Sequence, residues 1–276
     1  MGSGAKARVG LRPPPAGYCF ADLHLHTTGS DGLCTIDEWI AAAPRAHVSV
    51  IAITDHDHIE TVREWCHTSR VRAAPCKVIP GVELTARGRV VHVGVLFFGE
   101  VPARLPSPGT PLVMIIRWAR SIPDTIVVLV HPLPGLWRLQ LRGLARAGAL
   151  PDALETHFPL VGWRRRALAR AAQKYHLAVL GASDGHLTPG EIGTHLTLFP
   201  GETIDDLYLA CKLRSTQPIS RPKQKRLPLT VYLLQSIYSN LFSFRDRPRI
   251  ARFRTRVLAQ ARHRVRVAVS SEKVGS

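Results

Sequence analysis

The chain has 276 residues, 45% of them hydrophobic, and a mean hydropathy of +0.02. This composition supplies enough apolar surface for the core of one large domain and argues against a mainly disordered chain. The five cysteines are odd in number and form no Cys-x-x-Cys pair, so neither a disulfide framework nor a thiolate zinc site is indicated. We therefore expect a reducing, cytoplasmic setting.

The formal net charge of +17 is unevenly distributed along the chain. Residues 223–276 contain 13 Lys and Arg against 2 acids, a net of +11, whereas residues 1–222 contain 24 against 18, a net of +6. The excess of positive charge therefore lies in a C-terminal extension, and the body of the protein is only mildly basic.

The chain begins with a basic leader, residues 1–17, which lacks the apolar run of a signal peptide and which we exclude from the fold. After it, short apolar runs rich in β-branched residues alternate with helical stretches, which predicts βα units around a mainly parallel sheet. A capping box of Thr35 and Glu38 opens the first helix, which reaches about Ala46, with Pro44 kinking or ending it.

The remaining elements follow from the same patterns. The expected strands are Tyr18–Leu25, Val48–Thr54, Lys77–Ile79, Val90–Phe97, Thr125–Val130, Ala153–Thr156 and Ala178–Ala182. The expected later helices are Ile59–Thr68, Leu112–Ser121, Leu136–Ala147, Gly162–Tyr175 and Ile204–Ser215, the last with Thr203 as its N-cap.

The C-terminal extension, residues 223–276, is expected to be helical and basic. Leu227–Phe244 is uncharged over eighteen residues, close to the length of a short membrane span, but its polar residues leave an apolar stripe that favours docking on the barrel. The arginine-rich Arg245–Arg266 is a candidate solvated face, RNA contact or anionic-lipid contact. Peripheral membrane association through this extension remains open at this point.

Histidines and carboxylates recur where predicted strands end. In ADLHLHTTGSDG, the residues Asp22, His24 and His26 share one strand face because side chains alternate with period two. Five further signals follow predicted strands, where α/β barrels place their ligands. They are Asp31, Asp55-His56-Asp57, Glu83, His131 and Asp184 with His186. Burying so many ionisable groups costs several kcal/mol each unless they are paired or bind metal, which favours a metal site.

The motifs H-x-H, S-D-G, T-D-H-D, G-V-E, H-V-G, H-P and S-D-x-H occur in this order between residues 18 and 222. This series resembles the polymerase and histidinol phosphatase (PHP) superfamily. The resemblance implies a distorted seven-stranded, TIM-like β/α barrel for residues 18–222. It also implies three divalent ions, commonly zinc, manganese or iron.

The resemblance implies the following ligands, all of which are present in the chain. The first ion would be held by His24, His26, Glu83 and Asp184; the second by Glu83, His92 and His131; and the third by Asp31, His56 and His186. Glu83 would bridge the first two ions, and Glu83, Asp184 and His186 are the residues expected to be closest to catalysis. Asp22, Asp55 and Asp57 are read as acceptors that orient ligating imidazoles or as strand-end caps.

A metal-dependent phosphoesterase is the function that these residues predict. A water bridging two ions becomes hydroxide near neutral pH, and a third ion neutralises phosphate oxygens. The motif spacing is similar to small members of the superfamily that hydrolyse nucleoside 3′,5′-bisphosphates or trim RNA from its 5′ end. We therefore expect a nucleotide, oligonucleotide or other phosphorylated small molecule as substrate, and nothing indicates an obligate protein partner.

Three questions stay open on the sequence alone. Arg87 and Arg89 are candidate substrate contacts, although a solvated hairpin tip explains them equally well. The chain could instead be a histidinol-phosphate type of phosphomonoesterase. It could also be a catalytically silent metal-binding module whose basic tail binds nucleic acid or membrane.

Overall fold

The computed structural model describes residues 12–66, 68–88, 91–132, 136–159 and 161–221. Three predicted features lie outside these ranges: most of the leader, residues 89–90 with the candidate contact Arg89, and the C-terminal extension 223–276. The strands are β1 Tyr18–Leu25, β2 Val50–Ile53, β3 Lys77–Thr85, β4 His92–Phe97, β5 Thr125–Leu129, β6 Ala153–His157, β7 Ala178–Gly181, β8 His195–Pro200 and β9 Gln217–Ser220. The helices are α1 Ile36–Ala42, α2 Glu60–Cys66, α3 Ser69–Arg72, α4 Leu112–Arg120, α5 Trp137–Arg146, α6 Arg165–Tyr175 and α7 Ile204–Leu213.

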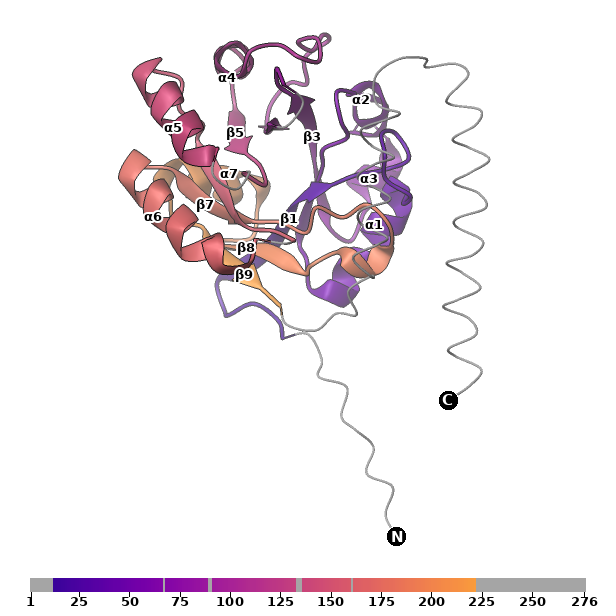
Figure 1. Ribbon diagram of the computed structural model, residues 1–276. Helices are drawn as coiled ribbons and strands as arrows, with labels where there is room; N and C mark the ends of the chain where they lie inside the picture. Colours follow the sequence, from indigo (N-terminus) through magenta and orange to yellow (C-terminus); the bar gives the residue numbers. More distant parts are fainter. Residues whose placement is uncertain (1–11, 67, 89–90, 133–135, 160, 222–276) are drawn as a thin grey trace.

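The strands form one sheet in the order β7-β6-β5-β4-β3-β2-β1-β8-β9. β4 pairs antiparallel with β3 and β5, and β8 pairs antiparallel with β1 and β9, while the other pairings are parallel. Within the described residues, seven strands therefore run in one direction and two run against them. The sheet curls until β7 comes close to β9 and β8, giving a nearly closed barrel (Figure 1).

The two faces of the sheet are both apolar, as expected for strands covered on each side. Val50 and Ala52 of β2 point into the barrel interior, where they pack with residues of β1, β5 and β7. Ile51 and Ile53 of the same strand point outward and pack against Trp39 of α1. The helices lie around the outside of the sheet (Figure 1), so the centre of the barrel is a packed core and the chemistry is confined to one rim.

The expected α/β barrel is confirmed, with differences at particular elements. The capping box at Thr35 and the N-cap at Thr203 begin α1 and α7 as predicted. Pro44 lies in the first turn of a short 3-10 helix, Ala43–Ala46, that follows α1. The sheet contains β8 and β9, which the sequence patterns did not reveal. β9 has the sequence QPIS, and its Pro and Gln residues hide the strand because they are rare in sheets.

Among the described residues, no helix combines the length and the apolar character needed to cross a bilayer. All five cysteines are free thiols.

Candidate metal centre

The candidate ligands lie at the rim formed by the carboxyl ends of the parallel strands. β1 carries His24 near its end and is followed by His26, β2 is followed by His56, and β3 carries Glu83. His131 comes two residues after β5, and Asp184 and His186 follow β7. His92 lies at the amino end of β4, which reaches the same rim because β4 runs in the opposite direction and pairs His92 with Thr85. Strand direction therefore brings all nine predicted residues to one end of the barrel.

Glu83 lies at the middle of this cluster and is completely buried. Its Oε1 is 2.8 Å from Nδ1 of His92 and 2.7 Å from Nε2 of His131. Its Oε2 is 3.0 Å from Nε2 of His24, 3.1 Å from Nε2 of His26 and 3.5 Å from Nδ1 of His56. One carboxylate thus approaches five imidazoles, the arrangement expected of a group shared between ions.

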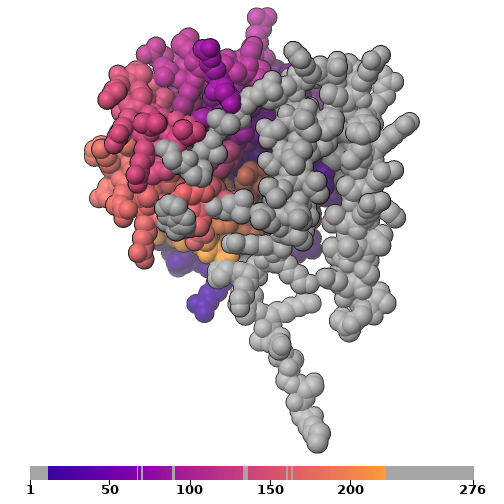
Figure 2. Space-filling view, viewed as in Figure 1, coloured from indigo at the N-terminus to yellow at the C-terminus, as the bar shows by residue number. Residues whose placement is uncertain are grey.

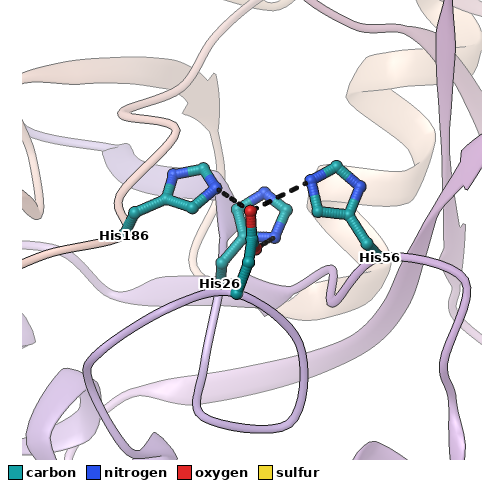
Figure 3. Close-up of side chains that lie close together, drawn as sticks. His26, His56 and His186 are labelled. Atoms are coloured by element: carbon teal, nitrogen blue, oxygen red, sulfur yellow. Dashed lines mark ion pairs between the residues drawn. The ribbon is translucent and has the colours of Figure 1, made fainter. Parts of the chain in front are cut away.

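Asp31 forms the second focus of the cluster. Its carboxylate is 3.5 Å from Nδ1 of His26, 3.6 Å from Nε2 of His56 and 3.4 Å from Nε2 of His186. Figure 3 shows these three imidazoles converging from three segments of the chain. The Nδ1–H of His186 donates to the Asp184 carbonyl oxygen at 2.9 Å, which leaves Nε2 directed toward Asp31.

Asp184 closes the cluster between these two foci. Its Oδ1 lies 3.5 Å from Nε2 of both His24 and His26 and 3.6 Å from Nδ1 of His186. The ligand atoms fall into overlapping groups within 4.8 Å of one another: His26, Asp31, His56 and His186; His24, His26 and Glu83; His24, His131 and Asp184; and His56, Glu83 and His92. Asp31, His56 and His186 fall in one group with His26, whereas His92 and His131 fall in different groups, so the assignment of ligands to individual ions stays a prediction.

The donor set fits divalent ions. Both ring nitrogens of His26 and Nδ1 of His92 are buried without a hydrogen-bond partner although carboxylate oxygens lie close to them. Buried polar atoms normally make hydrogen bonds. Ring nitrogens that lie near carboxylate oxygens without a hydrogen bond are the arrangement expected when both groups bind the same ion. Imidazole and carboxylate donors without thiolate suit zinc, manganese or iron.

The pKa shifts in the metal-free protein follow from the close packing of carboxylates and imidazoles. Burial works to raise the pKa of Glu83, but the surrounding histidines outweigh it and hold that pKa well below its usual range. Burial likewise opposes the charged form of His131 and His186, yet the neighbouring carboxylates raise their pKa to about 9 and about 10. Burial lowers the pKa of His56 to about 4, so this imidazole is neutral and available as a ligand at neutral pH.

Two residues of the cluster have unfavourable backbone conformations. His131 has φ of 24° and Asp184 has φ of 50°, a region that non-glycine residues rarely adopt. Such strain persists where the surroundings enforce it and is concentrated at functional sites. Here it turns both side chains back over the rim toward His24.

Glu155 is the important residue that the sequence patterns did not single out. It lies buried in β6, where Oε1 accepts from Nδ1–H of His24 at 3.2 Å and Oε2 accepts from the backbone N–H of His131 at 2.6 Å. A carboxylate on Nδ1 fixes the imidazole so that Nε2 points into the cluster. The detectable signal is an acidic residue in the middle of the apolar strand ALETH.

Asp22, Asp55 and Asp57 act on the backbone and hydroxyl groups rather than on imidazoles. Asp55 accepts from the N–H and hydroxyl of Thr27 and from the Ser30 hydroxyl, which holds the loop that carries Asp31. Asp22 accepts from the N–H groups of residues 183 and 193, and Asp57 accepts from the N–H of residue 85. Asp55 and Asp57 follow β2 and agree with the strand-end interpretation, whereas Asp22 lies within β1 and ties the segment after β7 to that strand.

The loop from residue 27 to 32 is also fixed by close packing. A Cβ placed on Gly32 would overlap the His26 carbonyl carbon and oxygen, so only glycine fits there. The indole N–H of the fully buried Trp39 donates to the same carbonyl at 2.9 Å.

The predicted substrate contacts are less defined. Arg87 is exposed in the turn after β3, where its backbone N–H donates to the Thr110 carbonyl. In the part of the chain that the structure describes, no ion pair joins its side chain to the cluster. Arg89 lies outside the described residues, so a substrate role for either arginine stays a prediction.

The fold and this cluster define an α/β barrel with a candidate site for divalent ions at the carboxyl ends of its parallel strands. Residues 22–188 match the family described as PHP domain, and residues 162–216 match a second described as PHP-associated. Because the first match covers more than half of the chain, the chain belongs to the PHP domain family.

Two curated relatives are similar to part of the chain. The 5′-3′ exoribonuclease Rnm of Salmonella typhimurium is 38% identical over 167 residues, which are 56% of this chain and 53% of the relative. A 5′-3′ exoribonuclease of Haemophilus influenzae is 31% identical over 88 residues, 31% of each chain. The matched region therefore spans about half of the first relative and about a third of the second.

Solved structures show the same fold at low sequence identity. A two-domain protein of Bacteroides vulgatus that contains a predicted PHP-like metal-dependent phosphoesterase is 16% identical with a TM-score of 0.60, over 79% of this chain and 70% of that one. PsfC from Pseudomonas syringae is 18% identical with a TM-score of 0.58, over 81% of this chain and 98% of that one. These likenesses confirm the predicted barrel.

Proposed function

We propose that this protein is a metal-dependent phosphoesterase that hydrolyses a phosphate ester of a nucleotide or oligonucleotide. The observation that carries the proposal is the convergence of nine imidazole and carboxylate side chains, with Glu83 and Asp31 as its two foci. Membership of the PHP domain family supports the same class of enzyme. The exoribonuclease names of the two partial relatives support a nucleic-acid phosphate as the substrate.

The proposed ligands are those implied by the resemblance. His24, His26, Glu83 and Asp184 would hold one ion, and Asp31, His56 and His186 another. His92 and His131, both on Oε1 of Glu83, would complete a third site. Bound zinc, manganese or iron would supply an activated water and neutralise phosphate charge.

The side chains of the protein prepare this chemistry. The two oxygens of Glu83 approach different imidazoles, His24 and His131 among them, which fixes the spacing between those rings. The hydrogen bond to the Asp184 carbonyl holds Asp184 and His186 together. A phosphate ester would approach on the side of Asp184, His92 and His131, whose side chains are the most exposed of the cluster. Glu155 is proposed to hold His24 and the start of the His131 loop in position.

We also propose residues 18–222 as the phosphoesterase domain and 223–276 as an appended basic extension, which remains a candidate contact for RNA or an anionic surface. The free state of all five cysteines supports the reducing cytoplasm as the proposed setting.

The test is hydrolysis of p-nitrophenyl phosphate and adenosine 3′,5′-bisphosphate by the full chain with added manganese. We expect turnover of both substrates by the wild type and its loss in Glu83→Gln. His47→Asn is the matched control, because His47 is exposed, lies away from the rim and has a positive φ that asparagine tolerates. Metal bound at full content without turnover of either substrate would refute the enzyme and favour a silent metal-binding module.

A further inference from the structure

Helices α5 and α6 contact each other and carry two rows of exposed cations. The basic face comprises Arg138, Arg142 and Arg146 on α5 and Arg166, Arg170 and Lys174 on α6. Each row repeats at every fourth residue, so its members lie along one side of the helix. The two helices form the left flank of the molecule in both views (Figures 1 and 2).

The basic face is not explained by helix stability. Neither helix contains an Asp or Glu, and like charges four residues apart cost a helix about 0.2–0.5 kcal/mol per pair. Within the described residues, no ion pair joins these six cations to an acidic side chain. The arrangement is therefore unfavourable in the free protein and is suited to an anionic partner.

A cavity lies beside the first turn of α6 and the end of β6. It measures about 530 Å³ and is lined by His157, Gly162, Arg165, Arg166 and Ala169. Arg166 is both a lining residue and the first cation of the α6 row. The cavity is thus concave and basic, whereas the rest of the face lies on the surface of two helices.

The cavity lies beside the candidate metal centre. His157 is the last residue of β6, two positions after Glu155, whose carboxylate reaches His24. Because β6 runs parallel to β5 and β7, its last residue lies at the same rim as the candidate ligands that follow those two strands. Burial and then the nearby Arg165 lower the pKa of His157 to about 4, so this side of the cavity offers a neutral imidazole beside a guanidinium.

We propose that the cavity and the basic face bind the sugar-phosphate backbone of a single-stranded oligonucleotide whose reacting phosphate lies at the metal centre. This inference rests on the proposed function and narrows its substrate from phosphate esters in general to a polynucleotide. Cations four residues apart on a helix are separated by about 6 Å along the axis, which gives a ladder of positive charge for successive phosphates. A lipid surface fits less well, because a planar membrane does not enter a concave cavity beside a catalytic rim.

The test compares two triple variants: one removes three charges from the basic face, and the other removes three charges from elsewhere on the surface. Arg142→Gln, Arg166→Gln and Arg170→Gln are combined in the face variant, and Lys77→Gln, Arg104→Gln and Arg120→Gln in the control variant, all at exposed positions. Glutamine keeps good helix propensity, and circular dichroism checks that both variants fold. Binding of a fluorescent single-stranded RNA of about 12 nucleotides is measured by anisotropy on the full chain with a chelator present, so that no hydrolysis occurs.

We expect the Kd of the face variant to rise about tenfold and the magnitude of its log Kd versus log salt slope to fall by about 2, because each phosphate neutralised on a single strand adds about 0.7 to that slope. With manganese, the ratio of kcat/KM for the RNA to that for p-nitrophenyl phosphate should fall about tenfold as well. Equal weakening in the control variant, or unchanged RNA binding in the face variant, overturns the proposal. Unchanged RNA binding with lost binding to phosphatidylserine vesicles would assign the face to lipid. If the wild type hydrolyses nothing, the proposed function fails while the anisotropy still decides the basic face.

Discussion

Glu155→Gln tests how the protein holds its candidate ligands. Glu155 accepts two hydrogen bonds, from Nδ1–H of His24 and from the N–H of His131. Glutamine has the same shape but only one accepting oxygen, so one of these donors must face its NH₂ group. If His24 takes the other tautomer to accept from that group, its Nε2 carries the proton and cannot bind an ion.

The size of the effect follows from these two bonds. A hydrogen bond to a charged group contributes about 1.5–3 kcal/mol, and changing the partner of a ligating imidazole typically weakens metal binding about 10–100-fold. The two figures agree, since tenfold corresponds to about 1.4 kcal/mol. We therefore expect Glu155→Gln to bind the ion at His24 about 10–100-fold more weakly while keeping its fold.

The assay is a competition titration with a chelator, with metal content read by mass spectrometry and folding by circular dichroism. Asp152→Asn is the matched control: Asp152 precedes the same strand and accepts from the Val127 N–H and Lys212, far from the rim. It should keep wild-type metal affinity. Wild-type affinity in a folded Glu155→Gln protein would refute the positioning role.

Three further outcomes are expected. Glu83→Gln should lose more than one ion per chain, because Glu83 approaches five imidazoles, and an unchanged metal content would contradict its bridging role. Gly32→Ala should destabilise the protein by about 1–3 kcal/mol through overlap with the His26 carbonyl. Gly143→Ala is the control: this glycine has open space around it in α5, and the change should stabilise the protein by about 0.5–1 kcal/mol. Chemical denaturation measures the free energy of unfolding of both variants. In metal-free protein, His131 and His186 have folded pKa values of about 9 and about 10 against an ordinary 6.5, so the stability they contribute is complete below pH 6.5 and is lost as pH rises through those values. The Tm of the metal-free protein should fall accordingly on the alkaline side, and a Tm that rises there would contradict the assigned charges.

Much of the rim could be predicted because ionisable residues that follow apolar strands must meet where those strands end. This reasoning places His56, His131 and Asp184 correctly at one end of the barrel. It could not explain His92, which begins its strand. The direction of β4 is a property of the assembled sheet, and only the antiparallel pairing shows why a residue at the start of a strand joins residues at the ends of others.

Glu155 and His157 show a second limit of sequence patterns. In a regular strand the two would share a face, because side chains alternate with period two. The register of β6 against β7 shifts between these residues, as in a β-bulge. Glu155 therefore reaches His24 while His157 lines the neighbouring cavity. A bulge leaves no reliable mark on five residues of sequence.

The arrangement of Glu83 and its neighbours has a consequence for folding kinetics. His26 and His186 are 160 positions apart (186 − 26), so their stacked rings meet only after the barrel has closed from its first strand to its seventh. A partly folded chain would bind such ions weakly, because ligands from both segments are needed. Contacts that form after the transition state slow unfolding more than they accelerate folding. Bound metal should thus act mainly by lowering the unfolding rate, which prolongs the lifetime of the closed barrel against proteolysis and heat.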